Sequence, residues 1–135
     1  MKIEKFSLGI LGANCYLLIN EETKDTVVVD PGGHSKKFTA YIEEEKLNLV
    51  AILLTHGHFD HIMGIDSILE NWNIPVYVEE EDLPIMTDPE LNLSTFASIS
   101  TQAITPTACC VAYFSLSIWI DTSSEVFTAR PLISP

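Results

Sequence analysis

Three of the four histidines in this chain of 135 residues lie within six positions of one another, in the segment from Thr55 to His61. His56 and His58 are separated by one glycine, and Asp60 stands directly before His61. Imidazole nitrogens and carboxylate oxygens are the ligands that hold zinc or iron at catalytic sites. The segment therefore predicts a centre that holds a cation and activates water.

The residues on either side predict where this centre lies in the fold. Residues 49–54 are a short, continuous apolar run, which is typical of a buried strand. Beyond the cluster, apolar side chains recur at helical spacing, namely Ile62, Ile65, Ile68 and Leu69. We therefore expect the cluster on a turn between a strand and a helix, where open α/β sheets bind their ligands.

The spacing inside the cluster suggests two groups of ligands. His56 and His58 are two positions apart, so an extended backbone places both side chains on one face, toward one metal. Asp60 and His61 open the next helix and are expected to point elsewhere, toward a second metal. Gly57 lets the backbone approach the ions closely. The alternative is that these are exposed polar residues of a loop, which the preceding apolar strand disfavours.

The first ninety residues predict an α/β fold, a layered sheet with helices outside. Ser35 is a plausible N-cap for a helix that runs to about Lys46 with Phe38, Tyr41 and Ile42 on its inner face. A second helix, with Gly64 in its first turn, should run from the histidines to about Trp72. The expected strands are 2–8, 14–20, 26–30, 49–54 and 76–78.

Asp30 is a second candidate site residue, at the end of a strand and before a Pro-Gly-Gly turn. It is either an acidic residue that starts the turn by binding the backbone or a carboxylate that orients a metal-binding histidine. His34 is expected to be an exposed loop residue. Asn14 and Cys15 open a strand and have ordinary interpretations as turn and core residues.

Composition narrows the classes of protein. The length suits one domain with one core. A formal net charge of −12 argues against nucleic acid as a partner, because a phosphate backbone requires a basic surface. The three cysteines (Cys15, Cys109 and Cys110) imply no disulfide framework, and the first residues carry no apolar signal region. These features favour a cytoplasmic protein.

The run from Thr55 to His61, together with residues 28–33 (Val-Val-Asp-Pro-Gly-Gly), resembles the signature of the metallo-β-lactamase superfamily. Residues 11–16 and 88–94 look like the branch related to glyoxalase II, the hydroxyacylglutathione hydrolases. The resemblance covers about residues 1–94. It implies an αββα sandwich, of which this chain holds the N-terminal half.

The resemblance also implies a hydrolase site with one or two metal ions, usually zinc, with iron or manganese as alternatives. His56 and His58 would serve the first metal, and Asp60 and His61 the second. Asp30 would be the supporting carboxylate, so that Asp60 and Asp30 are the acidic residues of the catalytic centre. The substrate would be a small thioester such as S-lactoylglutathione, or an ester.

Residues 95–135 depart from this pattern. Relatives complete the site with a further histidine, a bridging aspartate and a final histidine, but no histidine follows His61 here. Residues 1–91 carry 23 charged side chains and residues 92–135 carry three, and all six glycines lie at or before Gly64. The C-terminal part is thus incomplete or divergent with respect to the sandwich.

Three explanations for the tail are open. The first is that it comes from a shifted reading frame or a misjoined gene, which the abrupt change of composition favours. The second is that it is a divergent set of working strands. The third is that its apolar run 108–120 binds a membrane or a partner. That run is too short to span a membrane. Two functions follow: a hydrolase of the glyoxalase II type, or an inactive metal-binding fragment that binds at most one metal well. An uncovered sheet face would favour self-association.

Overall fold

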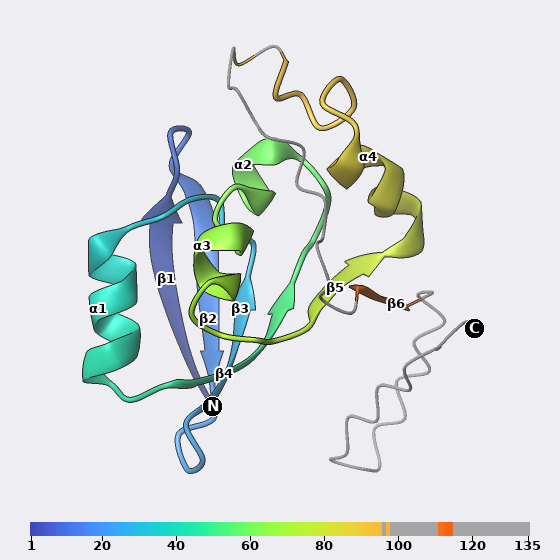
Figure 1. Ribbon diagram of the computed structural model, residues 1–135. Coiled ribbons are helices and arrows are strands. Elements are labelled where there is room, and N and C mark those ends of the chain that lie inside the picture. Colours follow the sequence, from blue (N-terminus) through green and yellow to red (C-terminus); the bar gives the residue numbers. More distant parts are fainter. Residues whose placement is uncertain (96, 98–110, 115–135) are drawn as a thin grey trace.

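A mixed, six-stranded sheet forms the framework of the protein (Figure 1). The computed structural model describes residues 1–95, 97 and 111–114. The strands lie side by side in the order β1-β2-β3-β4-β5-β6, so every neighbour in the sheet is also a neighbour along the chain. Their bounds are β1 Lys2–Leu8, β2 Ala13–Ile19, β3 Asp25–Val29, β4 Asn48–Leu53, β5 Val76–Glu79 and β6 Val111–Phe114.

The first three strands are antiparallel. A tight turn joins β1 to β2, and both Gly9 and Gly12 adopt positive φ angles there (71° and 65°), which glycine reaches without steric cost. In the resulting register Phe6 lies opposite Cys15. This hairpin agrees with the two strands that the sequence predicted.

The sheet becomes parallel after β3. Helix α1 (Lys36–Glu44) carries the chain from β3 back to β4, so both strands end at the same edge of the sheet. Its apolar side chains Phe38 and Ile42 are buried against the sheet, and Ser35 occupies the N-cap position as predicted, although its hydroxyl makes no capping bond. The crossover places the carboxyl ends of β3 and β4 next to each other.

The helix predicted after the histidines is two short helices, α2 (Phe59–Ile62) and α3 (Ile65–Leu69). Gly64 lies between them rather than within a first turn. Its N–H donates to the Pro31 carbonyl at 2.7 Å, and a Cβ at this position would lie 2.6 Å from that oxygen. The helix breaks because the loop after β3 presses directly against the backbone of Gly64.

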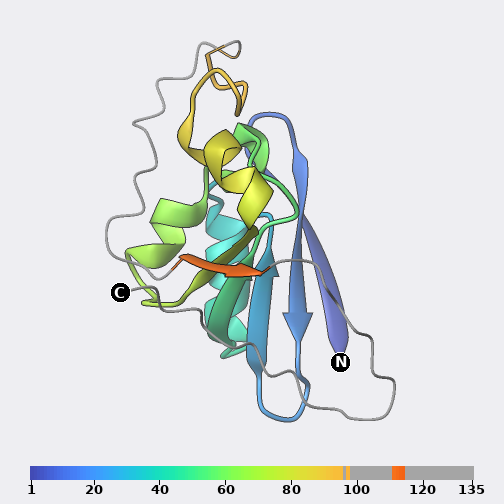
Figure 2. The same ribbon diagram turned by 90° about the vertical axis from the view of Figure 1, so that its right-hand side faces the viewer.

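Helices α1 and α3 cover the same face of the sheet (Figure 2). The core lies between them and the strands, and residues from α1, α3 and the inner strands meet in it, including Leu17, Val28, Phe38, Ile42, Ile52, Ile65 and Ile68. The described residues thus form one sheet with helices on one face, which is the α/β arrangement predicted from the sequence. Any second half of a sandwich lies outside these residues.

Residues 80–95 form elements that the sequence did not predict. The 3-10 turn η1 (Glu80–Asp82) continues into helix α4 (Leu83–Thr87), which lies beyond the end of β5 (Figure 1). The interpretations of the tail at 95–135, including the apolar run at 108–120, lie outside the described residues, except that the backbone of residues 111–114 pairs with β5 as the parallel strand β6. No helix among the described residues has the length and apolar character needed to span a membrane.

Candidate metal centre

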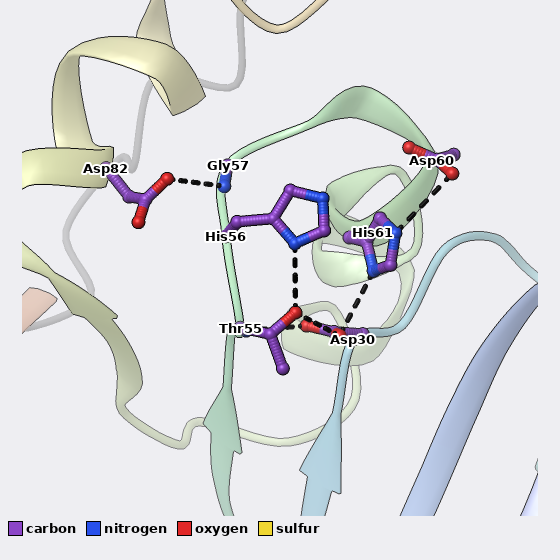
Figure 3. Close-up of polar contacts among 7 residues, drawn as sticks. All are labelled: Asp30, Thr55, His56, Gly57, Asp60, His61 and Asp82. Carbon is purple, nitrogen blue, oxygen red and sulfur yellow. Dashed lines mark hydrogen bonds and ion pairs between the residues drawn. The ribbon is translucent and has the colours of Figure 1, made fainter.

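The predicted site residues gather at the edge of the sheet where β3 and β4 end. The segment from Leu54 to His58 leaves β4 and leads into α2, whose first turn carries Asp60 and His61. Asp30 directly follows β3, the parallel neighbour of β4. Figure 3 shows the side chains of Asp30, Thr55, His56 and His61 lying close together.

Asp30 is a buried carboxylate held in an unusual backbone conformation. Its φ angle is +50°, in a region that residues other than glycine, asparagine and aspartate rarely adopt. Only 5% of the residue is exposed. Its two oxygens accept hydrogen bonds from the backbone N–H and the hydroxyl of Thr55, at 2.8 and 2.6 Å. The carboxylate therefore ties the end of β3 to the start of the histidine segment.

The three imidazole rings of the segment lie in contact. The centroid of the His56 ring is 4.6 Å from that of His58 and 4.1 Å from that of His61. The prediction that Asp60 and His61 point away from the first pair is therefore wrong for His61. The reason is that the first turn of α2 folds back beside His56, which brings its imidazole to the same place.

The carboxylates complete this group. Asp30 Oδ2 lies 3.0 Å from His61 Nδ1, and Asp60 Oδ2 lies 3.5 Å from His61 Nε2. Although it is near Asp30, the buried Nδ1 atom of His61 makes no hydrogen bond of acceptable geometry within the described part of the chain. A polar atom that is buried without a hydrogen bond is costly, and a catalytic role or a bound ion is among the explanations for such an atom.

The donor set fits a zinc or iron ion in its chemistry, since it consists of imidazoles and carboxylates. However, no three histidine, cysteine, aspartate or glutamate side chains among the described residues are arranged to hold one ion as they stand. The rings pack on one another instead. Metal binding would thus require the side chains to turn their nitrogens toward a common point, and the assignment of His56, His58, Asp60 and His61 as ligands stays a prediction.

The electrostatics of the cluster favour neutral imidazole at His56. Burial lowers the pKa of His56 below its usual value of 6.5, and the neighbouring His61 and His58 lower it further. A neutral imidazole keeps a lone pair on one ring nitrogen, which is the state that binds metal.

Contacts from residues 80–95 hold the histidine segment from outside. The N–H of Gly57 donates to the Asp82 carboxylate at 3.3 Å (Figure 3). The N–H of Phe59 donates to the carbonyl of Asn92 at 2.9 Å. A Cβ at Gly57 would lie 2.7 Å from the backbone nitrogen of Met86, so the segment and α4 are in backbone contact.

Two residues that support the histidine segment, Thr55 and Asp82, were not predicted from the sequence. Thr55 carried a signal, because a hydroxyl directly before the first histidine sits at the end of the buried strand. Asp82 carried none, since it belongs to an acidic run that is most simply a solvated surface. Of the other candidates, His34 and Asn14 are exposed, and Cys15 is fully buried. Burial raises the pKa of the Cys15 thiol to about 12, with a smaller contribution from Asp30.

Comparisons with known proteins agree with this geometry. The chain is 41% identical over 92 residues to the probable metallo-hydrolase YqgX of Bacillus subtilis, a match that covers 68% of this chain and 43% of the relative. It is 33% identical over 81 residues to hydroxyacylglutathione hydrolase GloC of Haemophilus influenzae, covering 60% of this chain and 38% of the relative. The chain spans about two fifths of the length of these curated relatives.

Solved structures share the fold. TTHA1623 in a di-iron-bound form is 32% identical, with a TM-score of 0.66 over 83% of this chain and 54% of that chain. The BLEG-1 B3 metallo-beta-lactamase is 37% identical, with a TM-score of 0.65 over 70% of this chain and 44% of that chain. The family model for the metallo-beta-lactamase superfamily matches residues 8–121, which includes part of the divergent tail. Both the predicted α/β fold and the predicted family are thus confirmed, and the chain belongs to the metallo-beta-lactamase superfamily.

Proposed function

We propose that this chain carries the metal centre of a metal-dependent hydrolase that acts on small thioesters or esters. One observation carries the proposal: three imidazoles meet at the carboxyl end of β4, with the carboxylates of Asp30 and Asp60 beside them. The family to which the chain belongs supports metal-dependent hydrolysis in general terms.

The residues divide into ligands and supports. His56 and His58 would hold a first metal ion, and Asp60 and His61 would hold a second. A divalent metal supplies a water of lowered pKa that is reactive near neutral pH. Zinc is our first choice, while iron and manganese suit the same ligands, and the relative TTHA1623 is described in a di-iron-bound form.

Asp30 would act beneath the ligands rather than as one of them. Its oxygens hold Thr55 and approach Nδ1 of His61, so the carboxylate fixes the direction in which the imidazoles face. Carboxylates in this position commonly orient metal-binding histidines. Thioesters suit such a centre because a thiolate leaves without protonation, and GloC, named a hydroxyacylglutathione hydrolase, supports S-lactoylglutathione as a substrate to test.

The second candidate is a metal-binding fragment without activity. One observation favours it: no histidine follows His61 in these 135 residues. In that case the chain binds a single ion well, because no further histidine is supplied as a ligand. A small molecule remains the proposed binding partner in the first case, and no nucleic acid is proposed in either, given the net charge of −12.

Metal titration and thioester hydrolysis test the proposal together. The purified chain of 135 residues, freed of metal, is titrated with zinc, and hydrolysis of S-lactoylglutathione is followed with zinc present. His58→Ala should weaken zinc binding and abolish hydrolysis. The matched control is His34→Ala, an exposed histidine outside the cluster.

The outcomes separate the two candidates. Zinc binding and hydrolysis that are both lost in His58→Ala and kept in His34→Ala support the hydrolase. Zinc binding without hydrolysis supports the fragment. A hydrolysis rate that His58→Ala leaves unchanged removes the hydrolase, and two tightly held zinc ions per chain would refute the single-ion version of the fragment.

A further inference from the structure

The Thr55 hydroxyl lies between the buried carboxylate and the first histidine of the cluster. Its Oγ1 atom is 2.6 Å from Asp30 Oδ2 and 3.0 Å from His56 Nδ1 (Figure 3). The backbone fixes this position from both sides. The Thr55 N–H donates to the other carboxylate oxygen at 2.8 Å, and the Asp30 N–H donates to the Leu53 carbonyl at 3.1 Å.

Counting hydrogens decides how these three groups are connected. A hydroxyl has one hydrogen to donate, and an ionised carboxylate can only accept. The short contact of 2.6 Å to Asp30 Oδ2 therefore takes the hydroxyl hydrogen. Thr55 Oγ1 is then left as an acceptor toward His56 Nδ1, and this contact is a hydrogen bond only if Nδ1 carries a hydrogen.

The opposite tautomer would leave one contact without a hydrogen. With the hydrogen on Nε2, Nδ1 of His56 is an acceptor and requires the hydroxyl hydrogen for itself. Thr55 Oγ1 and the carboxylate oxygen would then face each other at 2.6 Å with no hydrogen between them. Thr55 is exposed, but Asp30 is only 5% exposed, so the repulsion would fall on a carboxylate that has little solvent around it.

We propose that Thr55 is a positioning residue that holds His56 in the tautomer with its hydrogen on Nδ1, so that the lone pair of Nε2 is available to a metal ion. Through Thr55, Asp30 directs His56 as well as His61, which it approaches directly. A metal-binding imidazole is commonly oriented by a hydrogen bond from its second ring nitrogen. The link to metal binding rests on the proposed function, whereas the tautomer does not.

The tautomer can be measured in the metal-free chain of 135 residues. Histidine labelled with ¹⁵N gives distinct ring nitrogen shifts for the two tautomers, recorded about two pH units above the usual histidine pKa of about 6.5. The His56 signals are assigned from their loss in His56→Gln. We expect the hydrogen on Nδ1 in the natural chain and in Thr55→Ser, which keeps the hydroxyl.

Thr55→Val removes the hydroxyl while keeping the branched shape, and the hydrogen of His56 is expected to redistribute toward Nε2. Thr55→Ala repeats the test with a smaller side chain if the valine variant does not fold. A natural chain with the hydrogen on Nε2 would overturn the proposal. So would valine or alanine variants whose His56 keeps the hydrogen on Nδ1 as firmly as the natural chain does.

Cobalt(II) titration connects the tautomer to metal binding. We expect the dissociation constant for cobalt to rise about 10-fold in Thr55→Val and to stay within about twofold in Thr55→Ser, the lower end of what such supporting residues contribute. Equal affinity in the natural chain and Thr55→Val would contradict the positioning role. If the natural chain binds no cobalt, the proposed function fails, while the NMR result still decides the tautomer.

Discussion

Replacing Asp30 is the strongest test of how the site is held together. The site requires both the carboxylate of Asp30 and its left-handed backbone, and different substitutions separate the two. Its carboxylate accepts two hydrogen bonds from Thr55, and its backbone adopts a left-handed φ of +50°. Asp30→Ala removes the carboxylate and also puts alanine in a left-handed conformation, which alanine adopts less readily than aspartate. Asp30→Gly removes the carboxylate but relieves the backbone.

The magnitudes follow from these contacts. Hydrogen bonds to a charged group contribute about 1.5–3 kcal/mol each, and loss of the acceptor for the part-buried Thr55 N–H is included in that cost. We therefore expect Asp30→Ala to lower the free energy of unfolding by about 3–5 kcal/mol, allowing for non-additivity between two adjacent bonds. Asp30→Gly should be about 1 kcal/mol less damaging, because glycine adopts positive φ freely.

Asp30→Asn is the matched control. Asparagine tolerates the left-handed backbone and keeps one carbonyl oxygen for the Thr55 N–H, but it loses the charge. Its free energy of unfolding should lie between those of the natural chain and Asp30→Ala. The measurement is equilibrium unfolding in urea with the metal-free protein. Asp30→Gly that is less stable than Asp30→Ala, or Asp30→Ala within about 1 kcal/mol of the natural chain, would refute the reasoning.

Three further predictions follow from contacts near the site and on the surface. Gly57→Ala places a methyl group 2.7 Å from the Met86 backbone nitrogen, so we expect a loss of about 1–3 kcal/mol in urea unfolding and weaker zinc binding in calorimetry; unchanged values for both would show that α4 does not hold the segment. Burial raises the pKa of the Cys15 thiol to about 12, against about 9 for an unburied thiol, so the native thiol stays protonated near pH 9 while the unfolded one ionises. Stability should therefore fall as the pH rises above about 9, and iodoacetamide near pH 8.5 should modify Cys15 only in denaturant; equal rates in native and denatured protein would contradict its burial. Ile10 and Leu11 are 67% and 64% exposed on the β1–β2 turn, and we expect these apolar side chains to promote self-association. In size-exclusion chromatography the natural chain should elute as an associated species and the double serine variant as a smaller one, with stability changed by less than about 0.5 kcal/mol. A natural chain that elutes as a monomer, or a variant that elutes like the natural chain, would contradict this expectation.

Sequence patterns predicted the elements that depend on local spacing. The alternation in β1, the apolar content of β2, the branched residues of β3 and the apolar run of β4 each predicted a strand whose bounds lie within one or two positions of the observed ones. The position of the histidines at the end of β4 followed from the same patterns, since the sheet fixes where a strand ends. These signals lie within the segments themselves and need no knowledge of distant contacts.

The features that were missed depend on contacts between distant segments. The break at Gly64 comes from the Pro31 carbonyl, 33 positions earlier in the chain, and no local pattern reports that contact. The return of His61 to the side of His56 depends on how α2 leaves the loop, which side-chain spacing alone does not determine. The role of Asp82 was hidden for the same reason, because its acidic neighbours are exposed and only its own carboxylate reaches Gly57.

The bond between Asp30 and Thr55 spans only 25 positions of the chain, all within one β3–α1–β4 unit. The enclosed loop is short enough that closing it costs little chain entropy, and extending the chain on either side leaves that cost unchanged. The link between Asp30 and Thr55 is therefore made within a single βαβ unit, and α2 and residues 80–95 complete the cluster around it.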